Sequence, residues 1–151
     1  MVKIFKLTTA ALFALILAFQ IATPAMADAR DHKVVIHVDE NDAKRMNLAL
    51  NNAENLTSYY KSKGEKVAIE VVAYGPGLNM FRQDTSPVKT RIAAMSLKLD
   101  NISFAACGNT KAKMEAKSGK KIQIISEARM VPSGVVQLMT RQEQGWSYIR
   151  P

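Results

Sequence analysis

Residues 32–38 read HKVVIHV, a β-branched stretch that is apolar almost throughout. A near-continuous apolar run suits a strand that is buried on both faces, as in a parallel sheet. Residues 66–74 (KVAIEVVAY) and 101–106 (NISFAA) are predicted to form the second and third strands. Residues 122–126 and 146–149 are predicted to form the fourth and the last strand.

Helical segments separate these strands. The acidic stretch 39–42 favours the start of a helix that runs to about Lys63 and has one apolar face. Ser86 is predicted to cap a second helix that begins at Pro87, because proline is well suited to a first helical position. The alternation of strand and helix begins directly after the first strand and continues along the chain.

Two further helices are expected at about residues 110–118 and 135–144. Strands separated by helices of this length imply right-handed crossovers. The sequence therefore predicts an α/β protein, a three-layer α/β/α sandwich around a parallel sheet. The 151 residues suffice for one such domain with its own core.

The composition excludes several classes of protein. The chain is 48% hydrophobic and 23% charged, which excludes a disordered, collagen-like or low-complexity protein. Its 21 Lys and Arg against 13 Asp and Glu give a net charge of +8. The basic residues are spread over several helices without interleaved aromatic residues, so a solvated surface is favoured over a nucleic-acid interface.

The first 27 residues have the layout of a secretory signal peptide. Lys3 and Lys6 precede an apolar run at 7–21, and Ala-Met-Ala at 25–27 offers a cleavage site. The run is shorter than the roughly 20 residues that a membrane span needs. We therefore expect residues 28–151 to form a periplasmic or secreted domain with no integral membrane span after cleavage.

Cys107 is the only cysteine, which excludes an internal disulfide framework and a Cys-rich zinc site. It is predicted to lie between the third strand and a helix, where unpaired N–H groups and the helix dipole stabilise a thiolate. A buried cysteine with only a packing role is the alternative. No metal site is expected, since His32 and His37 should point to opposite faces of one strand.

A second loop is expected beside Cys107. Gly75-Pro76-Gly77 follows the second strand, and neighbouring strands of a parallel sheet bring the loops at their carboxyl ends together. The two loops are therefore expected to share a pocket. Glu70 interrupts the apolar second strand and is expected to face a rim or to pair with a lysine.

Four stretches together resemble the DsrE/DsrF-like family, and the similarity covers about residues 32–151. They are FAACGNT at 104–110, AYGPGL at 73–78, PSGV at 132–135 and GWSYI at 145–149. The resemblance implies a five-stranded parallel sheet in the order 4-3-2-1-5 and a homo-oligomer, a trimer or a hexamer. A signal peptide is a departure from the sulfur-relay members of that family, which act in the cytoplasm.

The resemblance also implies a site and a chemistry. In the sulfur-relay members a cysteine after the third strand carries a persulfide, and Cys107 occupies the matching position. The backbone N–H groups of Gly108 and Asn109 would hold the outer sulfur. The substrate pocket would include Gly75 and Gly77, with Asn79, Asn109 and Arg82 as weaker candidates for its wall.

Asn109 and Thr110 are also expected as caps of the following helix. No cofactor is implied. The partners would be a sulfur compound or a thiol protein that donates or accepts sulfur.

Three functions remain open from the sequence. The first is a sulfur carrier, sulfurtransferase-like or thiol-redox protein that acts through Cys107. The second is a non-catalytic oligomeric binding or accessory protein of the periplasm in which Cys107 is only structural. The third is a basic protein that attaches to a membrane surface or an acidic partner.

Overall fold

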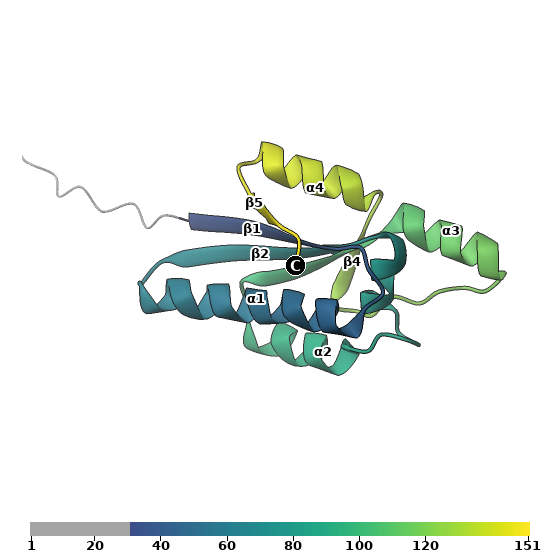
Figure 1. The fold of residues 1–151 in the computed structure, drawn as a ribbon, viewed down its shortest axis with the longest axis horizontal. Helices are drawn as coiled ribbons and strands as arrows, with labels where there is room; N and C mark the ends of the chain where they lie inside the picture. The colour runs from purple at the N-terminus through teal and green to yellow at the C-terminus, as the bar shows by residue number, and fades with distance from the viewer. Residues whose placement is uncertain (1–30) are drawn as a thin grey trace, which may run out of the picture.

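A five-stranded sheet with the order β4-β3-β2-β1-β5 forms the middle of the structure (Figure 1). The computed structural model describes residues 31–151, so the predicted signal peptide at 1–27 lies outside the described residues. Every strand pair in the sheet is parallel. The predicted α/β fold and its strand order are confirmed. The strands are β1 (Asp31–Val38), β2 (Lys66–Ala73), β3 (Ile102–Cys107), β4 (Ala128–Val131) and β5 (Ser147–Ile149).

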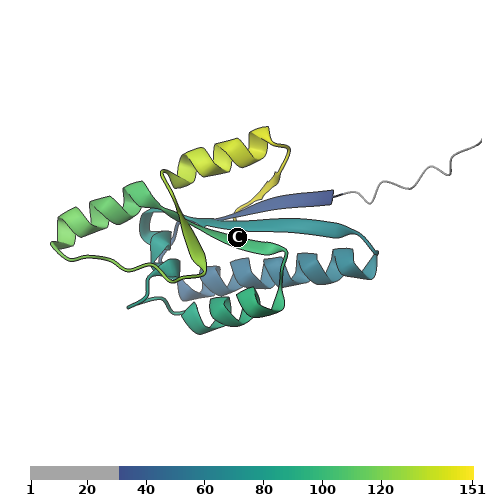
Figure 2. The same cartoon turned by 180° about the vertical axis from the view of Figure 1, so that it is seen from behind.

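The helices cover the two faces of the sheet unequally. One face is covered by α1 (Ala43–Ser62) and α2 (Lys89–Lys98), and the other by α4 (Gly134–Glu143) (Figures 1 and 2). The helix α3 (Gly108–Ser118) extends beyond the carboxyl ends of the strands in both views and buries none of its residues. A short 3-10 helix, η1 (Gly75–Phe81), follows β2 at the same edge.

Alternating side chains of the strands build a separate core on each face. Val34, Ile36 and Val38 of β1 belong to the larger core, which packs against α1 and α2. Val35 of β1 belongs to the smaller core on the α4 face, which also contains Val72, Ala105, Val131 and Leu138. The small size of the second core leaves α4 dependent on polar contacts with the sheet.

Two predicted boundaries are wrong. Residues 122–126 are not the fourth strand, which lies at Ala128–Val131. Ile122 and Ile125 are buried, but the backbone of Ile125 donates to the carbonyl of Phe81 instead of pairing with β3. The apolar run therefore reflects packing of a loop against the end of η1.

The second helix also begins later than predicted. Val88 takes its N-cap position and Lys89 is the first helical residue, so Pro87 precedes the helix. The hydroxyl of Ser86 accepts a hydrogen bond from the Val88 N–H at 3.3 Å and donates to the carbonyl of Met80. Ser86 thus fixes the turn between η1 and α2.

A buried carboxylate joins α4 to the sheet. Glu70 lies in the middle of β2 with its side chain fully buried on the α4 face. It accepts hydrogen bonds from Gln137 at 2.7 Å and from Arg141 at 2.7 and 3.3 Å, and it pairs with Arg129. The expectation of a rim position or a lysine partner is therefore wrong. Burial acts to raise the pKa of Glu70, but the hydrogen bonds from Arg141, Gln137 and Arg129 lower it below its usual value.

Glu70→Gln is expected to lower the free energy of unfolding by about 2 kcal/mol, because it removes one member of a buried ion cluster. Glu54→Gln is the control, since Glu54 forms a partly exposed surface pair with Arg91, and surface ion pairs contribute about 0–1 kcal/mol. Urea unfolding at neutral pH measures both values. Equal losses in the two variants would contradict the anchoring role of Glu70.

The same carboxylate predicts a pH dependence of stability. Because the pKa of Glu70 is lower in the folded than in the unfolded protein, its stabilisation is complete above the unfolded pKa. It is lost as the pH falls through the folded pKa. We expect a decline in stability as the pH drops below about 5. In Glu70→Gln, urea midpoints measured across this range should decline less steeply than in the parent protein.

Candidate functional site at the carboxyl edge of the sheet

The two predicted loops meet at the carboxyl edge. β2 and β3 are neighbours in the sheet, and the Gly75 N–H donates to the hydroxyl oxygen of Thr110 at 3.0 Å. Thr110 belongs to the first turn of α3, three residues after Cys107. A single side chain therefore links the loop after β2 to the helix that follows β3.

Cys107 itself is the N-cap of α3. Its sulfur accepts a hydrogen bond from the Thr110 N–H at 3.4 Å. Asn109 and Thr110 are therefore not caps, as expected from the sequence, but residues of the first helical turn. The N–H of Asn109 donates to the carbonyl of Pro132 at 3.1 Å, and its side chain is exposed.

Groups at the starts of two helices, α3 and α4, affect the pKa of the Cys107 thiol. Burial acts to raise the pKa of Cys107, but hydrogen bonds from the Thr110 hydroxyl and from the amides of Gly134, Thr110 and Asn109 lower it below its usual value. The environment thus favours a thiolate, although the residue is only 4% exposed.

Gly134 is required for this approach. A Cβ atom on Gly134 would lie 2.8 Å from Cβ of Tyr74, so the start of α4 packs directly against that side chain. Gly108 is also confined, because its Cβ would lie 3.1 Å from the carbonyl oxygen of Val131. The glycines therefore allow the backbones around Cys107 to pack closely.

An aromatic cluster lies on the face of the sheet that α4 covers. His37 stacks on Tyr74 with ring centroids 4.6 Å apart, and its Nδ1 is hydrogen-bonded to the Tyr148 hydroxyl at 2.7 Å. Burial lowers the pKa of His37, and it raises the pKa of Tyr74. Both groups are consequently neutral at pH 7 and form an uncharged wall. His32 instead stacks on Tyr60 of α1, which confirms that the two histidines face opposite ways.

The glycines of the second loop differ in role. Gly75 adopts a positive φ of 52°, which favours glycine. A Cβ atom on Gly77 would lie 2.3 Å from the carbonyl oxygen of Val38, and the Gly77 N–H donates to the Asp39 carbonyl at 3.0 Å. Gly77 is therefore committed to packing η1 against the end of β1.

A cavity of about 580 Å³ opens between η1, α3 and the loop after β1. Of the residues predicted for the site, Gly75, Asn79 and Arg82 line this cavity, whereas Cys107, Gly108, Asn109 and Gly77 do not. Tyr74, Thr110 and Lys113 also line it. No sequence motif marked these last three for the cavity, because their importance depends on the arrangement of the loops.

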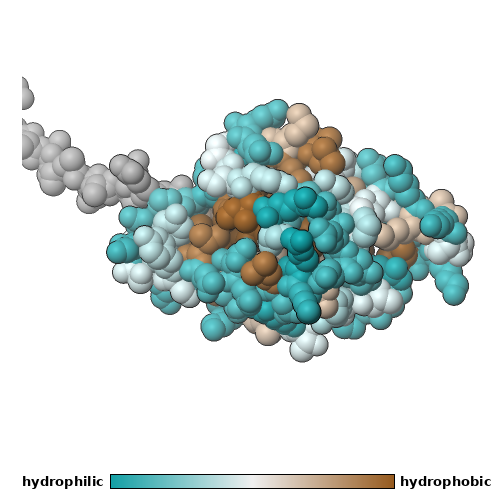
Figure 3. Space-filling view, viewed as in Figure 1, coloured by the Kyte–Doolittle hydropathy of each residue, from teal (hydrophilic) through white to brown (hydrophobic). Residues whose placement is uncertain are grey.

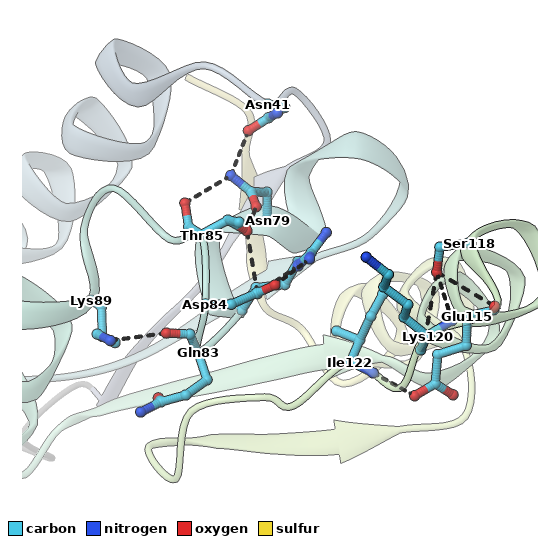
Figure 4. Close-up of polar contacts among 11 residues, drawn as sticks. Asn41, Asn79, Gln83, Asp84, Thr85, Lys89, Glu115, Ser118, Lys120 and Ile122 are labelled. Carbon is cyan, nitrogen blue, oxygen red and sulfur yellow. Dashed lines mark hydrogen bonds and ion pairs between the residues drawn. The ribbon is translucent and has the colours of Figure 1, made fainter.

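Asn79 is held at the rim of the cavity by side-chain hydrogen bonds. Its Nδ2 donates to Oδ1 of Asn41 at 2.8 Å, and its Oδ1 accepts from the Thr85 hydroxyl (Figure 4). Arg82 donates to both carboxylate oxygens of Asp84, at 3.0 and 2.6 Å. The rim is therefore a connected polar network.

Comparison with solved structures identifies a relative. The structure of a protein of unknown function, MTH1491 from Methanobacterium thermoautotrophicum, is 36% identical in sequence, with a TM-score of 0.68. The similarity covers 80% of this chain and 100% of that chain. This chain belongs to the MTH1491 family. Comparisons with protein-family models and with curated proteins give no match.

Since the MTH1491 relative is itself described as a protein of unknown function, the chemistry of this family member has to be inferred from its own site. Within residues 31–151, no helix is long and apolar enough to cross a membrane. The same residues contain no group of three or more His, Cys, Asp or Glu side chains placed to hold a metal ion.

Thr110→Val is expected to raise the pKa of Cys107, because it removes the hydroxyl donor but retains the backbone N–H. Alkylation of the thiol at pH 7 should then slow by about threefold to tenfold, in proportion to the lost thiolate fraction. Thr90→Val, at an exposed position of α2, is the control. If the alkylation rate depends on pH in the same way in the parent protein and in both variants, Thr110 does not lower the pKa of Cys107.

Proposed function

We propose that the protein is an exported sulfur carrier of the DsrE/DsrF type that holds a persulfide on Cys107. The observation that supports this most strongly is the position of Cys107 as the N-cap of α3, where its sulfur accepts a hydrogen bond from the Thr110 N–H at 3.4 Å. The Thr110 hydroxyl and amides from the first turns of α3 and α4 lower the pKa of the thiol despite its burial. A thiol that only fills space has no need of this arrangement.

The chemistry follows from the properties of a thiolate. The Cys107 thiolate attacks the sulfane sulfur of a donor, the donor's S–S bond breaks, and the leaving group departs with the electron pair. The product is a persulfide anion on Cys107. A second thiolate then attacks the outer sulfur and regenerates the Cys107 thiolate. The chain has one cysteine, so the acceptor thiol belongs to another molecule.

The place and assembly of the protein are part of the proposal. The signal-peptide layout of residues 1–27 supports action in the periplasm or outside the cell. Apolar surface gathers on α4 (Figure 3), where Val135, Val136 and Met139 are 49%, 59% and 55% exposed. Such a surface supports assembly into a trimer or a hexamer.

A non-catalytic binding protein is the second candidate. The observation that favours it is the exposure of Cys107, which at 4% is typical of a packing residue. In that case the cavity beside Thr110 would hold a ligand, and the sulfur would remain unreactive. The two candidates differ in what happens to Cys107 in the presence of a sulfane-sulfur donor.

Incubation with a sulfane-sulfur donor is expected to add one or more sulfur atoms to the protein, measured by intact-mass spectrometry. Cys107→Ser should show no gain. Adding a low-molecular-weight thiol afterwards should restore the original mass, because the outer sulfur is transferred. A cysteine that gains no sulfur and is alkylated only on unfolding would instead support the binding protein.

A further inference from the structure

The cavity beside Thr110 has a cationic lining. Arg82 and Lys113 contribute positive charges, and no carboxylate is among its lining residues. Arg82 is paired with Asp84, whereas Lys113 forms no ion pair within residues 31–151. The neighbouring Lys111 is bound to Glu115 at 2.8 Å. Lys113 is thus the uncompensated charge at this cavity.

Thr110 links this cavity to the buried Cys107. Thr110 lines the cavity, and its backbone N–H donates to the Cys107 sulfur at 3.4 Å. Tyr74 also lines the cavity and packs against Gly134 at the start of α4. A compound bound in the cavity therefore contacts the residue whose backbone is hydrogen-bonded to the sulfur.

A second cavity provides a contrast. It measures about 690 Å³ and lies at the amino-terminal ends of the strands, with Lys61 and Lys66 in its lining. Glu65 and Asp100 line it as well, so its charges are mixed. It is also remote from the carboxyl ends of the strands, where parallel sheets place their sites. Of these two cavities, the one at Lys113 combines a cationic lining with proximity to the thiol.

We propose that this cavity binds a small anionic compound that carries a sulfane sulfur, and that it is the donor subsite for Cys107. This inference rests on the proposed function. Lys113 attracts the anion, and the Asn41 side chain at the rim offers a polar contact. With thiosulfate as the donor, the Cys107 thiolate bonds to the outer sulfur, the S–S bond breaks, and sulfite leaves with the electron pair. The protein retains a persulfide anion, and no oxidant or reductant is consumed.

The rate of persulfide formation tests the role of Lys113. Lys113→Gln is compared with Lys117→Gln, which removes the same charge from α3 at a position outside the cavity. The donors are thiosulfate and the uncharged diallyl trisulfide. Attack of the Cys107 thiolate on the trisulfide breaks one S–S bond, leaves an allyl disulfide or allyl trisulfide on the cysteine and releases allyl persulfide or allyl thiolate. The rate of Cys107 modification by each donor is followed by intact-mass spectrometry. With thiosulfate, Lys113→Gln should react about fivefold more slowly than the parent protein, as expected for one partly solvated charge. The difference should vanish at 1 M salt.

The neutral donor should react equally with all three proteins, and Lys117→Gln should match the parent with both donors. Equal slowing by the two lysine variants with thiosulfate would overturn the subsite, because it would show a general effect of net charge. An unchanged rate in Lys113→Gln would overturn it as well.

Failure of the proposed carrier function can be distinguished from failure of the donor subsite. If neither donor adds sulfur, the carrier function is wrong. Binding of thiosulfate to Cys107→Ser, measured by calorimetry, then tests the anion site without sulfur chemistry. Weaker binding in Cys107→Ser carrying Lys113→Gln would still support an anion site, and equal binding would overturn that too.

Discussion

The buried carboxylate of Glu70 is the interaction on which the α4 side of the molecule depends. The core on that face is small, and α4 buries few apolar side chains in it. Apolar contacts alone would leave the orientation of this helix weakly determined. Gln137 and Arg141, one turn apart on α4, both bind Glu70, and Arg129 of β4 completes its neutralisation. A buried charge tolerates few alternative arrangements, so it fixes the position of the helix.

The position of α4 in turn determines the environment of Cys107. Because Gln137 and Arg141 are held over the middle of β2, the first residue of α4 reaches the carboxyl edge at Cys107. There Gly134 packs against Tyr74 at a distance that excludes any larger side chain. At the other end of α4, Arg141 also stacks over Trp146 with 4.5 Å to the ring centroid, next to β5. Through α4, Glu70 therefore contributes to the environment that lowers the pKa of the Cys107 thiol, beside the larger effect of Thr110 in α3.

The sequence predicted a strand most reliably where both faces of the strand are buried in the core. The apolar run at 32–38 predicted a strand buried on both faces, and β1 buries Val34 and Ile36 in one core and Val35 in the other. The edge strand β4 was misplaced because its signal is weak, with exposed Arg129 and Met130 inside it. Ile122 and Ile125 are apolar for a different reason, since they cover the core from a loop. Periodicity does not separate these two cases.

Side-chain partners were harder to predict than elements. The order of strands and helices predicted that Cys107 lies just before a helix. The effect of α4 on the pKa of Cys107 could not be predicted, because Gly134 is 27 positions away in the sequence. Glu70 looked like an isolated acid because its partners Arg129 and Arg141 come from distant segments. Thr110 was expected as a cap, and only the meeting of the two loops shows that its hydroxyl serves both Gly75 and Cys107.

The helix α3 is best understood through this site. None of its residues is buried, and Met114 is its side chain that packs against the larger core. Its first turn supplies amides and a hydroxyl to the thiol, and Lys113 follows Thr110 by three residues, which places both on one side of the helix. One short helix thus donates an N–H to the Cys107 sulfur and presents a cation to the adjacent cavity. In the donor subsite that we propose, Lys113 offsets the repulsion between an anionic donor and the Cys107 thiolate, which is the main electrostatic obstacle to their reaction.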